Sequence, residues 1–238
     1  MLNRHSPVLL ACILLFSILQ CYSCNNAYTY NNPLHLKVTI VAESQSIPKW
    51  KIKQAVNILR DIYRNSGLGI TISCQQIKYA HKHENSPNNY ATDIASDSNR
   101  EIDGVDLFNG LKTIADTMRR TNGLITKTSP IFFLHLEENP SVYGASVENG
   151  IFIGNPIAVC TVKPEDTPKE IGETMAHELA HLLGAKHDGD GNGCMPSGYL
   201  METIYTKSDE LKIFSTCSKS DIKNKLVKNE IERSKVDT

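Results

Sequence analysis

The residues best suited to chemistry lie together in the stretch HELAHLLGAKHD, which runs from position 177 to 188. An α-helix turns by about 100° per residue, so His177 and His181 project from the same helical face. Two imidazoles in this arrangement can hold a metal ion between them. Glu178, offset by one residue, can reach a water molecule on that metal without being a ligand.

His187 lies six residues after His181, too far to share that face if the helix simply continued. Gly184 supplies the break, because a glycine after the last turn can adopt the left-handed conformation that ends a helix. The chain can then bend and bring His187 to the same metal. Three neutral nitrogens leave a fourth position for water, as in a catalytic zinc site, so we expect one Zn²⁺ per chain.

Histidines are also common as ordinary surface or core residues, and a bare HExxH arises by chance. The pattern here is stricter, because it fixes three histidines, a glutamate and a glycine at set offsets. A metal site is therefore the better interpretation.

The residues before the histidines predict the helix that must position them. Thr167 to Glu170 form a capping-box sequence with proline at the first helical position. Apolar residues then recur at helical spacing, which predicts a helix over 168–184. They are Ile171, Met175, Leu179, Leu182 and Leu183.

Strand and helix patterns alternate before this helix, and this alternation predicts an α/β fold in one domain with a sheet covered by helices. We find no internal repeat and no linker. The expected strands are 34–42, 68–79, 130–138 and one or two short ones in 144–154 around a turn at 148–150. The expected helices are 47–65, 105–120 and a short one starting near 218–221. Residues 81–100 are expected to form a loop.

The N-terminus has the composition of a secretory signal peptide. Arg4 precedes an apolar run over 7–19, which is shorter than the roughly 20 residues that span a bilayer. We expect a leader over 1–24, with cleavage between 23 and 27, and a secreted chain over 25–238. The net charge of −1 gives no reason to expect binding to nucleic acid or to a membrane surface.

Four of the seven cysteines would remain after cleavage, namely Cys74, Cys160, Cys194 and Cys217. An even number in an oxidising compartment predicts two disulfides, for which three pairings exist. The CYSC at 21–24 also fits a redox motif, but its place beside the cleavage region favours the leader.

Two other stretches resemble metal sites more weakly. DGDGNG at 188–193 is like the first half of a calcium-binding loop, but Tyr199 stands where a bidentate glutamate would be needed, so we interpret it as a turn. His81 and His83 are better explained as part of a solvated loop.

HExxHxxGxxH followed by a methionine, here Met201, is the signature of the metzincins. Within them the chain resembles the adamalysin or reprolysin group, because Asp188 follows the third histidine and FSTCS stands at 214–218. The likeness is strongest over 172–218, and a short secreted form of this kind resembles those of venoms and arthropod saliva.

The resemblance implies a metzincin-type catalytic domain with a mixed twisted sheet, long helices and a central zinc-binding helix. An upper part, 25–187, would be followed by a small C-terminal subdomain, 188–238, with the Met-turn. The zinc ligands would be His177, His181 and His187, with Glu178 as general base, and Met201 would form an apolar floor beneath the metal. Ile204 and Tyr205 would line the pocket for the side chain after the scissile bond.

The resemblance also implies a Cys194–Cys217 disulfide, which leaves Cys74 and Cys160 to pair by elimination. Calcium occurs in this family, but we can match no ligands for it here.

The expected function is zinc-dependent hydrolysis of peptide bonds within extracellular proteins, host proteins among them, by a monomer. The family likeness makes 144–154 the best candidate for a sheet edge that pairs with substrate. The alternative is a secreted binding protein that keeps zinc but does not cut. Retention of Glu178 argues against it, because a structural zinc needs no base beside it.

Overall fold

The computed structural model describes residues 33–79, 112–113, 115–117, 119–120, 125–138, 140 and 142–236, with side chains to 230. The expected leader and most of the expected loop over 81–100 lie outside these residues. So do the parts of the expected 105–120 helix before Lys112, whereas the described residues from 112 to 120 are helical. No helix in the described ranges is long and apolar enough to cross a membrane.

A five-stranded sheet forms the centre of the fold, in the order β2-β1-β3-β5-β4. The first four strands in this order pair in parallel with one another, and β4 alone runs antiparallel, against β5. The mixed α/β architecture expected from the sequence is therefore confirmed. The strands are β1 (Leu34–Ala42), β2 (Ile70–Tyr79), β3 (Ile131–Leu136), β4 (Gly144–Ser146) and β5 (Ile157–Val162).

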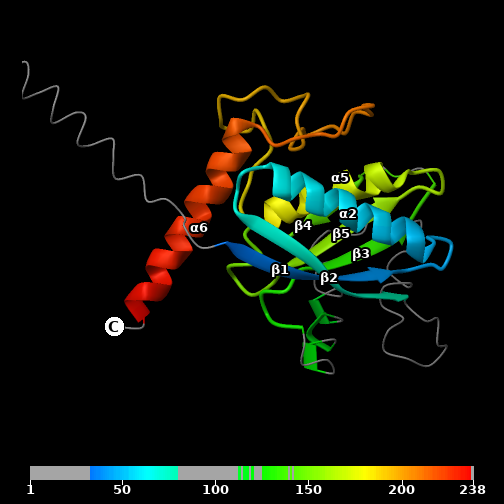
Figure 1. Ribbon diagram of the computed structural model, residues 1–238, viewed down its shortest axis with the longest axis horizontal. Helices are drawn as coiled ribbons and strands as arrows, with labels where there is room; N and C mark the ends of the chain where they lie inside the picture. The colour runs from blue at the N-terminus through cyan, green and yellow to red at the C-terminus, as the bar shows by residue number, and fades with distance from the viewer. Residues whose placement is uncertain are drawn as a thin grey trace, which may run out of the picture. The chain divides into compact units, whose positions relative to one another are not determined.

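Two long helices, α2 (Lys49–Asn65) and α5 (Pro168–Leu182), lie on the same side of the sheet and pack against each other (Figure 1). The phenol of Tyr63 on α2 donates a hydrogen bond of 3.1 Å to the carbonyl of Ala176 on α5. Gly172 allows the close approach, because a Cβ there would lie 2.6 Å from Cβ of Ile58. The sheet and α2 thus form a rigid support for α5.

The buried face of α2 is the one that the apolar periodicity predicts. Six apolar residues that recur at helical spacing within 47–65 are all buried, and they are Ile52, Ala55, Val56, Leu59, Ile62 and Tyr63.

The expectation for 144–154 is confirmed, because one short strand, β4, is followed by turns over 148–154. Two other elements were predicted wrongly. The next strand, β5, was not predicted. The C-terminal helix α6 (Thr216–Val236) has 21 residues and is not short.

Candidate metal centre

The helix that carries the first two histidines begins with the predicted capping box. The hydroxyl of Thr167 accepts from the backbone N–H of Glu170, and the Glu170 carboxylate accepts from the backbone N–H of Thr167 at 2.7 Å. The helix ends with Leu183 as its C-cap and Gly184 at a φ of +90°. Gly184 N–H donates to the His181 carbonyl and Ala185 N–H to the Ala180 carbonyl, both at 2.9 Å. This glycine-ended turn redirects the chain toward His187.

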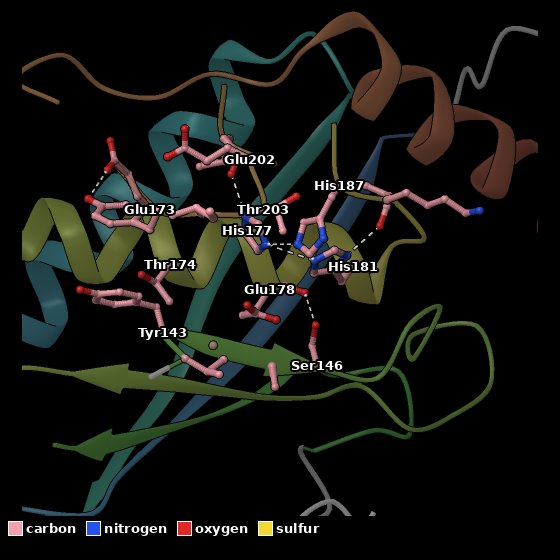
Figure 2. A pocket seen from close by; sticks show the side chains of 18 of the residues that line it. Tyr143, Ser146, Glu173, Thr174, His177, Glu178, His181, His187, Glu202 and Thr203 are labelled. Atoms are coloured by element: carbon pink, nitrogen blue, oxygen red, sulfur yellow. Dashed lines mark hydrogen bonds between the residues drawn. The ribbon is translucent and has the colours of Figure 1, made fainter. Parts of the chain in front are cut away.

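The three histidines meet as the spacing predicts. Their Nε2 atoms lie 3.1 Å from one another in all three pairs (Figure 2). A tetrahedral zinc with Zn–N distances of about 2.0–2.1 Å would separate its nitrogens by about 3.3–3.4 Å, so the triad has nearly the required size. It is also the one cluster of metal-ligating side chains found within the described ranges.

Backbone carbonyls orient two of the rings. His177 Nδ1 lies 2.7 Å from the Leu200 carbonyl and His181 Nδ1 lies 2.8 Å from the Ala185 carbonyl. A carbonyl only accepts hydrogen bonds, so both Nδ1 atoms carry the proton and both Nε2 atoms present lone pairs. Lone pairs at 3.1 Å repel each other unless a cation lies between them. The donor set therefore fits a metal ion.

Burial keeps these rings neutral. Burial, together with the neighbouring histidines, lowers the pKa of His177 from 6.5 to about 3. Burial likewise lowers the pKa values of His181 and His187, although backbone and carboxylate partners oppose the shift. Neutral imidazole is the form that binds zinc, so the triad is ready for metal at physiological pH.

Glu178 lies beside the triad with 3% of its surface exposed. Burial raises the pKa of its carboxyl from 4.5 to about 7, although a hydrogen bond with Ser146 opposes the shift. Within the described ranges its Oε2 atom is buried and has no hydrogen-bond partner. Its other oxygen lies against Gly144 of β4, where an added Cβ would be only 2.4 Å from Oε1.

A cleft of about 640 Å³ opens over the triad and Glu178. One side is formed by β4 and the residues just before it, and the other by α5 and the segment after Met201 (Figure 2). The lining includes Ile204 and Tyr205, the two residues expected at the substrate pocket. Ile204 is 78% exposed, whereas the Tyr205 hydroxyl donates to Oε2 of Glu173 at 3.0 Å.

Met201 is fully buried in the chain that passes beside the triad. Its neighbour Leu200 holds the ring of His177 through its carbonyl, and the Met201 carbonyl accepts from the N–H of Asp188 at 2.8 Å. The carboxylate of Asp188 accepts in turn from the hydroxyls of Ser215 and Ser218, at 2.5 and 2.9 Å. The Met201 segment and the start of α6 are therefore tied to the chain directly after His187.

A disulfide joins Cys194 to Cys217, with their Cα atoms 6.1 Å apart. The second expected pair, Cys74 with Cys160, is wrong, because both are free thiols. Cys74 lies on β2 and Cys160 on β5, and β1 and β3 lie between them. Three strand spacings of about 4.8 Å exceed the roughly 7 Å between Cα atoms that a disulfide tolerates.

Several residues of the cleft were not identified from the sequence. Glu173 had a usable signal, since it lies four residues before His177 and so on the same helical face. Gly144, Glu202 and Lys212 also line the cleft, but they had no such signal.

Comparisons with known proteins agree with this geometry. Residues 119–232 match the model of the Reprolysin (M12B) family zinc metalloproteases. A disintegrin and metalloproteinase with thrombospondin motifs 13 of Homo sapiens is 39% identical over 59 residues, 24% of this chain and 4% of that protein. A disintegrin and metalloproteinase with thrombospondin motifs 18 of Mus musculus is 37% identical over 65 residues, 27% of this chain and 5% of that protein. The chain thus spans about a twentieth of these relatives.

Among solved structures, metalloproteinase-II from Bacteroides fragilis aligns with 84% of this chain and 58% of its own, with a TM-score of 0.54. The two chains are 16% identical, so this likeness shows the fold alone. The family match over 119–232 and the histidine triad on α5 support a metzincin zinc metalloprotease of the reprolysin type, and the structural likeness agrees with that fold.

Proposed function

We propose that this chain is a secreted zinc-dependent endopeptidase that cleaves proteins outside the cell. One observation carries the proposal. Three Nε2 atoms converge, and the buried carboxyl of Glu178 lies beside them with one oxygen, Oε2, that has no hydrogen-bond partner among the described residues. A structural zinc site has four protein ligands and needs no adjacent base. Three ligands with a base beside them favour hydrolysis.

The ligands would be His177, His181 and His187, holding one zinc ion. Zinc held there would supply Lewis acidity, lowering the pKa of a water molecule toward about 7 and polarising the scissile carbonyl. Glu178 takes the proton from the attacking water. It then delivers that proton to the leaving amine, so that the one carboxyl serves first as base and then as acid.

The substrate would bind as an extended strand along β4. This strand is at the edge of the sheet, and its residues Gly144 to Ser146 line the cleft. Its inner side already pairs with β5, so the outer side is the one a peptide could join. Exposed apolar side chains at Val142 and Ile204, which also line the cleft, would contact the side chains of that peptide.

Secretion is supported by the leader-like N-terminus and by the disulfide between Cys194 and Cys217, since disulfides persist in oxidising compartments. We propose Met201 as the Met-turn residue, supported by its complete burial. The tie between its carbonyl and the residue after His187 supports the same role. Tyr205 and Ile204 are proposed as pocket residues because both line the cleft.

The test is cleavage of a denatured general protein substrate by the zinc-loaded chain. A zinc chelator should stop the cleavage, and added zinc should restore it. The Glu178→Ala variant should keep its zinc and lose at least about a hundredfold in rate, as expected when a general base is removed. A folded wild-type chain that holds one zinc and cuts nothing would instead support the alternative of a binding protein.

A further inference from the structure

The wall of the cleft opposite β4 is a segment without helix or strand, Thr203–Lys212, which we call the wall segment. Its side chains are exposed except for the partly buried Tyr205 and Leu211 and the buried Lys212, and its apolar Ile204 is 78% exposed. Apolar burial therefore does little to hold this wall. The contacts that hold the wall segment in place therefore also set the width of the cleft.

Two buried carboxylates hold the wall segment. Glu173 on α5, with a side chain 0% exposed, accepts the Tyr205 hydroxyl at 3.0 Å and the backbone N–H of Lys212 at 2.9 Å. Glu202 accepts the backbone N–H of Thr206 at 2.7 Å and its hydroxyl at 3.0 Å. Both ends of the segment are thus fixed by carboxylate oxygens.

The ammonium group of Lys212 completes the network. It forms an ion pair with Glu202 in which both side chains are almost fully buried, and it lies 4.0 Å from the centroid of the Tyr205 ring. That ring lies 5.5 Å from the ring of Tyr143, which immediately precedes β4 on the other side of the cleft. The network therefore connects α5, the wall segment and the entrance to the edge strand, and Figure 2 shows Glu173 and Glu202 at the same end of the cleft.

Two contacts made by lysine side chains, Lys169 and Lys207, add to this network. Lys169 bridges Glu173, at 3.0 Å, and the carbonyl of Ser208, at 2.7 Å. Lys207 pairs with Glu170 at 2.7 Å but is 66% exposed, so solvent and salt weaken that contact.

We propose that Glu173 and Glu202 are positioning residues that hold the wall segment against α5 and so set the affinity of the cleft for substrate. This proposal rests on the proposed peptidase function, and it assigns the two carboxylates a part in binding rather than in proton transfer. Glu173 and Glu202 line the cleft, but the rings of His177 and His181 are oriented by the carbonyls of Leu200 and Ala185. Loosening the wall should therefore weaken binding and leave the chemical step nearly intact.

The first experiment compares peptide hydrolysis by the zinc-loaded full chain and its Glu202→Gln and Glu173→Gln variants. Both substitutions keep the side-chain size and remove the charge. We expect KM to rise about tenfold, with kcat within about threefold of the wild type. Glu210→Gln is the matched control, because it makes the same change at an exposed position of the wall segment and should behave as the wild type.

The second experiment measures amide hydrogen exchange in the zinc-loaded proteins without substrate. Amides of residues 203–212 should exchange about tenfold faster in the two variants, whereas amides of α5 and β5 should not change. This readout does not depend on hydrolysis. If the wild type cuts nothing but the wall amides loosen as expected, the function fails and the positioning role stands.

A third, more conservative variant is a control for misfolding of the two Glu→Gln variants. Tyr205→Phe keeps the ring and removes only the hydroxyl that Glu173 accepts, so a smaller rise in KM and a smaller loosening of the wall should follow. Unchanged KM and unchanged exchange in all three variants would overturn the proposal. Equal loosening of α5, β5 and the wall would also overturn it, because the carboxylates would then serve only general stability.

Discussion

Gly144 determines where the carboxyl of Glu178 can lie. A Cβ at this position would be 2.4 Å from Oε1 and 2.9 Å from Cδ of Glu178, closer than carbon atoms approach in proteins. The absence of a side chain at this position of the edge strand therefore leaves room for the Glu178 carboxyl, the proposed base, beside the triad. A single methyl group there must push the carboxyl away or displace β4.

Gly144→Ala should consequently lower kcat by at least about tenfold, because a shift of about 1 Å in a catalytic group has effects of this size or more. Zinc content should stay at the wild-type level, since the histidines are held by the carbonyls of Leu200 and Ala185. Gly193→Ala is the control, because nothing lies within 4 Å of an added Cβ there. Equal kcat in wild type and Gly144→Ala would show that the contact does not position Glu178.

His135 at the end of β3 forms a pH-dependent contact with Glu43. Its Nδ1 lies 2.5 Å from Oε2 of Glu43, and Oε2 of Glu137 lies 3.9 Å from its Nε2. The hydrogen bond with Glu43 raises the pKa of His135 above 6.5, although burial opposes the shift. A raised pKa means that the protonated ring stabilises the fold fully below pH 6.5 and loses that effect as pH rises through the folded pKa.

The difference in unfolding free energy between wild type and His135→Gln should therefore be larger at pH 5.5 than at pH 8.5. Denaturant unfolding at the two pH values measures it. Glu43→Gln should remove the same pH-dependent part, because it takes away the partner. If the difference in unfolding free energy were larger at pH 8.5 than at pH 5.5, the stabilising contact of protonated His135 with Glu43 would be contradicted.

The convergence of the three histidines could be predicted from the sequence because local helix geometry decides it. His177, His181 and Gly184 lie within one helix and its C-terminal turn, so fixed offsets are sufficient. Gly144 and Lys212 could not be predicted in the same way. Each reaches the site only through the sheet or through a long irregular segment, and no spacing in the sequence reports such a contact.

The carbonyls in the last turn of α5 accept hydrogen bonds from residues that precede this helix in the sequence. The N–H groups of Asn149 and Ile151 donate to the carbonyls of His181 and Leu182, at 3.0 and 3.2 Å. Asn149 adopts a φ of +59° to do so. The pattern of 144–154 allows a second strand after the expected turn at 148–150, but the buried Ile151 lies in further turns instead. Tertiary contacts with α5 outweigh the local strand propensity of this segment.

The Cys194–Cys217 bridge fixes the loop after His187 to the start of α6. It closes a loop with a sequence separation of 23, for which chain entropy predicts a stabilisation of about 3 kcal/mol. The double variant Cys194→Ser/Cys217→Ser should lose roughly that amount of unfolding free energy, measured by denaturant titration. Cys74→Ser, at a free and partly buried thiol, should cost less. A loss no greater than that of Cys74→Ser would show that the bridge contributes little.

At the scale of the whole molecule, zinc should stabilise the fold as well as activate water. His181 lies on α5 and His187 lies after the turn at Gly184, so a shared metal joins two parts of the chain that otherwise depend on backbone hydrogen bonds. A ligand that binds only the folded state stabilises it by about 2.7 kcal/mol at a hundred times its dissociation constant.

A chelator should therefore lower the Tm of the wild type by several degrees, and added zinc should restore it. His187→Ala, which removes one ligand, should melt at a lower temperature and respond less to the chelator. The same Tm with and without chelator in a zinc-loaded protein would contradict this linkage.

The three imidazoles should bind one zinc ion and leave a position open to water. X-ray absorption at the zinc edge of the purified, zinc-loaded chain tests it most directly, because it reports the number and kind of ligand atoms. We expect three imidazole nitrogens at about 2.0–2.1 Å from the zinc and one oxygen. That oxygen should be replaced when a small zinc-binding inhibitor such as a hydroxamate is added. Four protein ligands that do not change on addition of the inhibitor, or a sulfur among them, would contradict it.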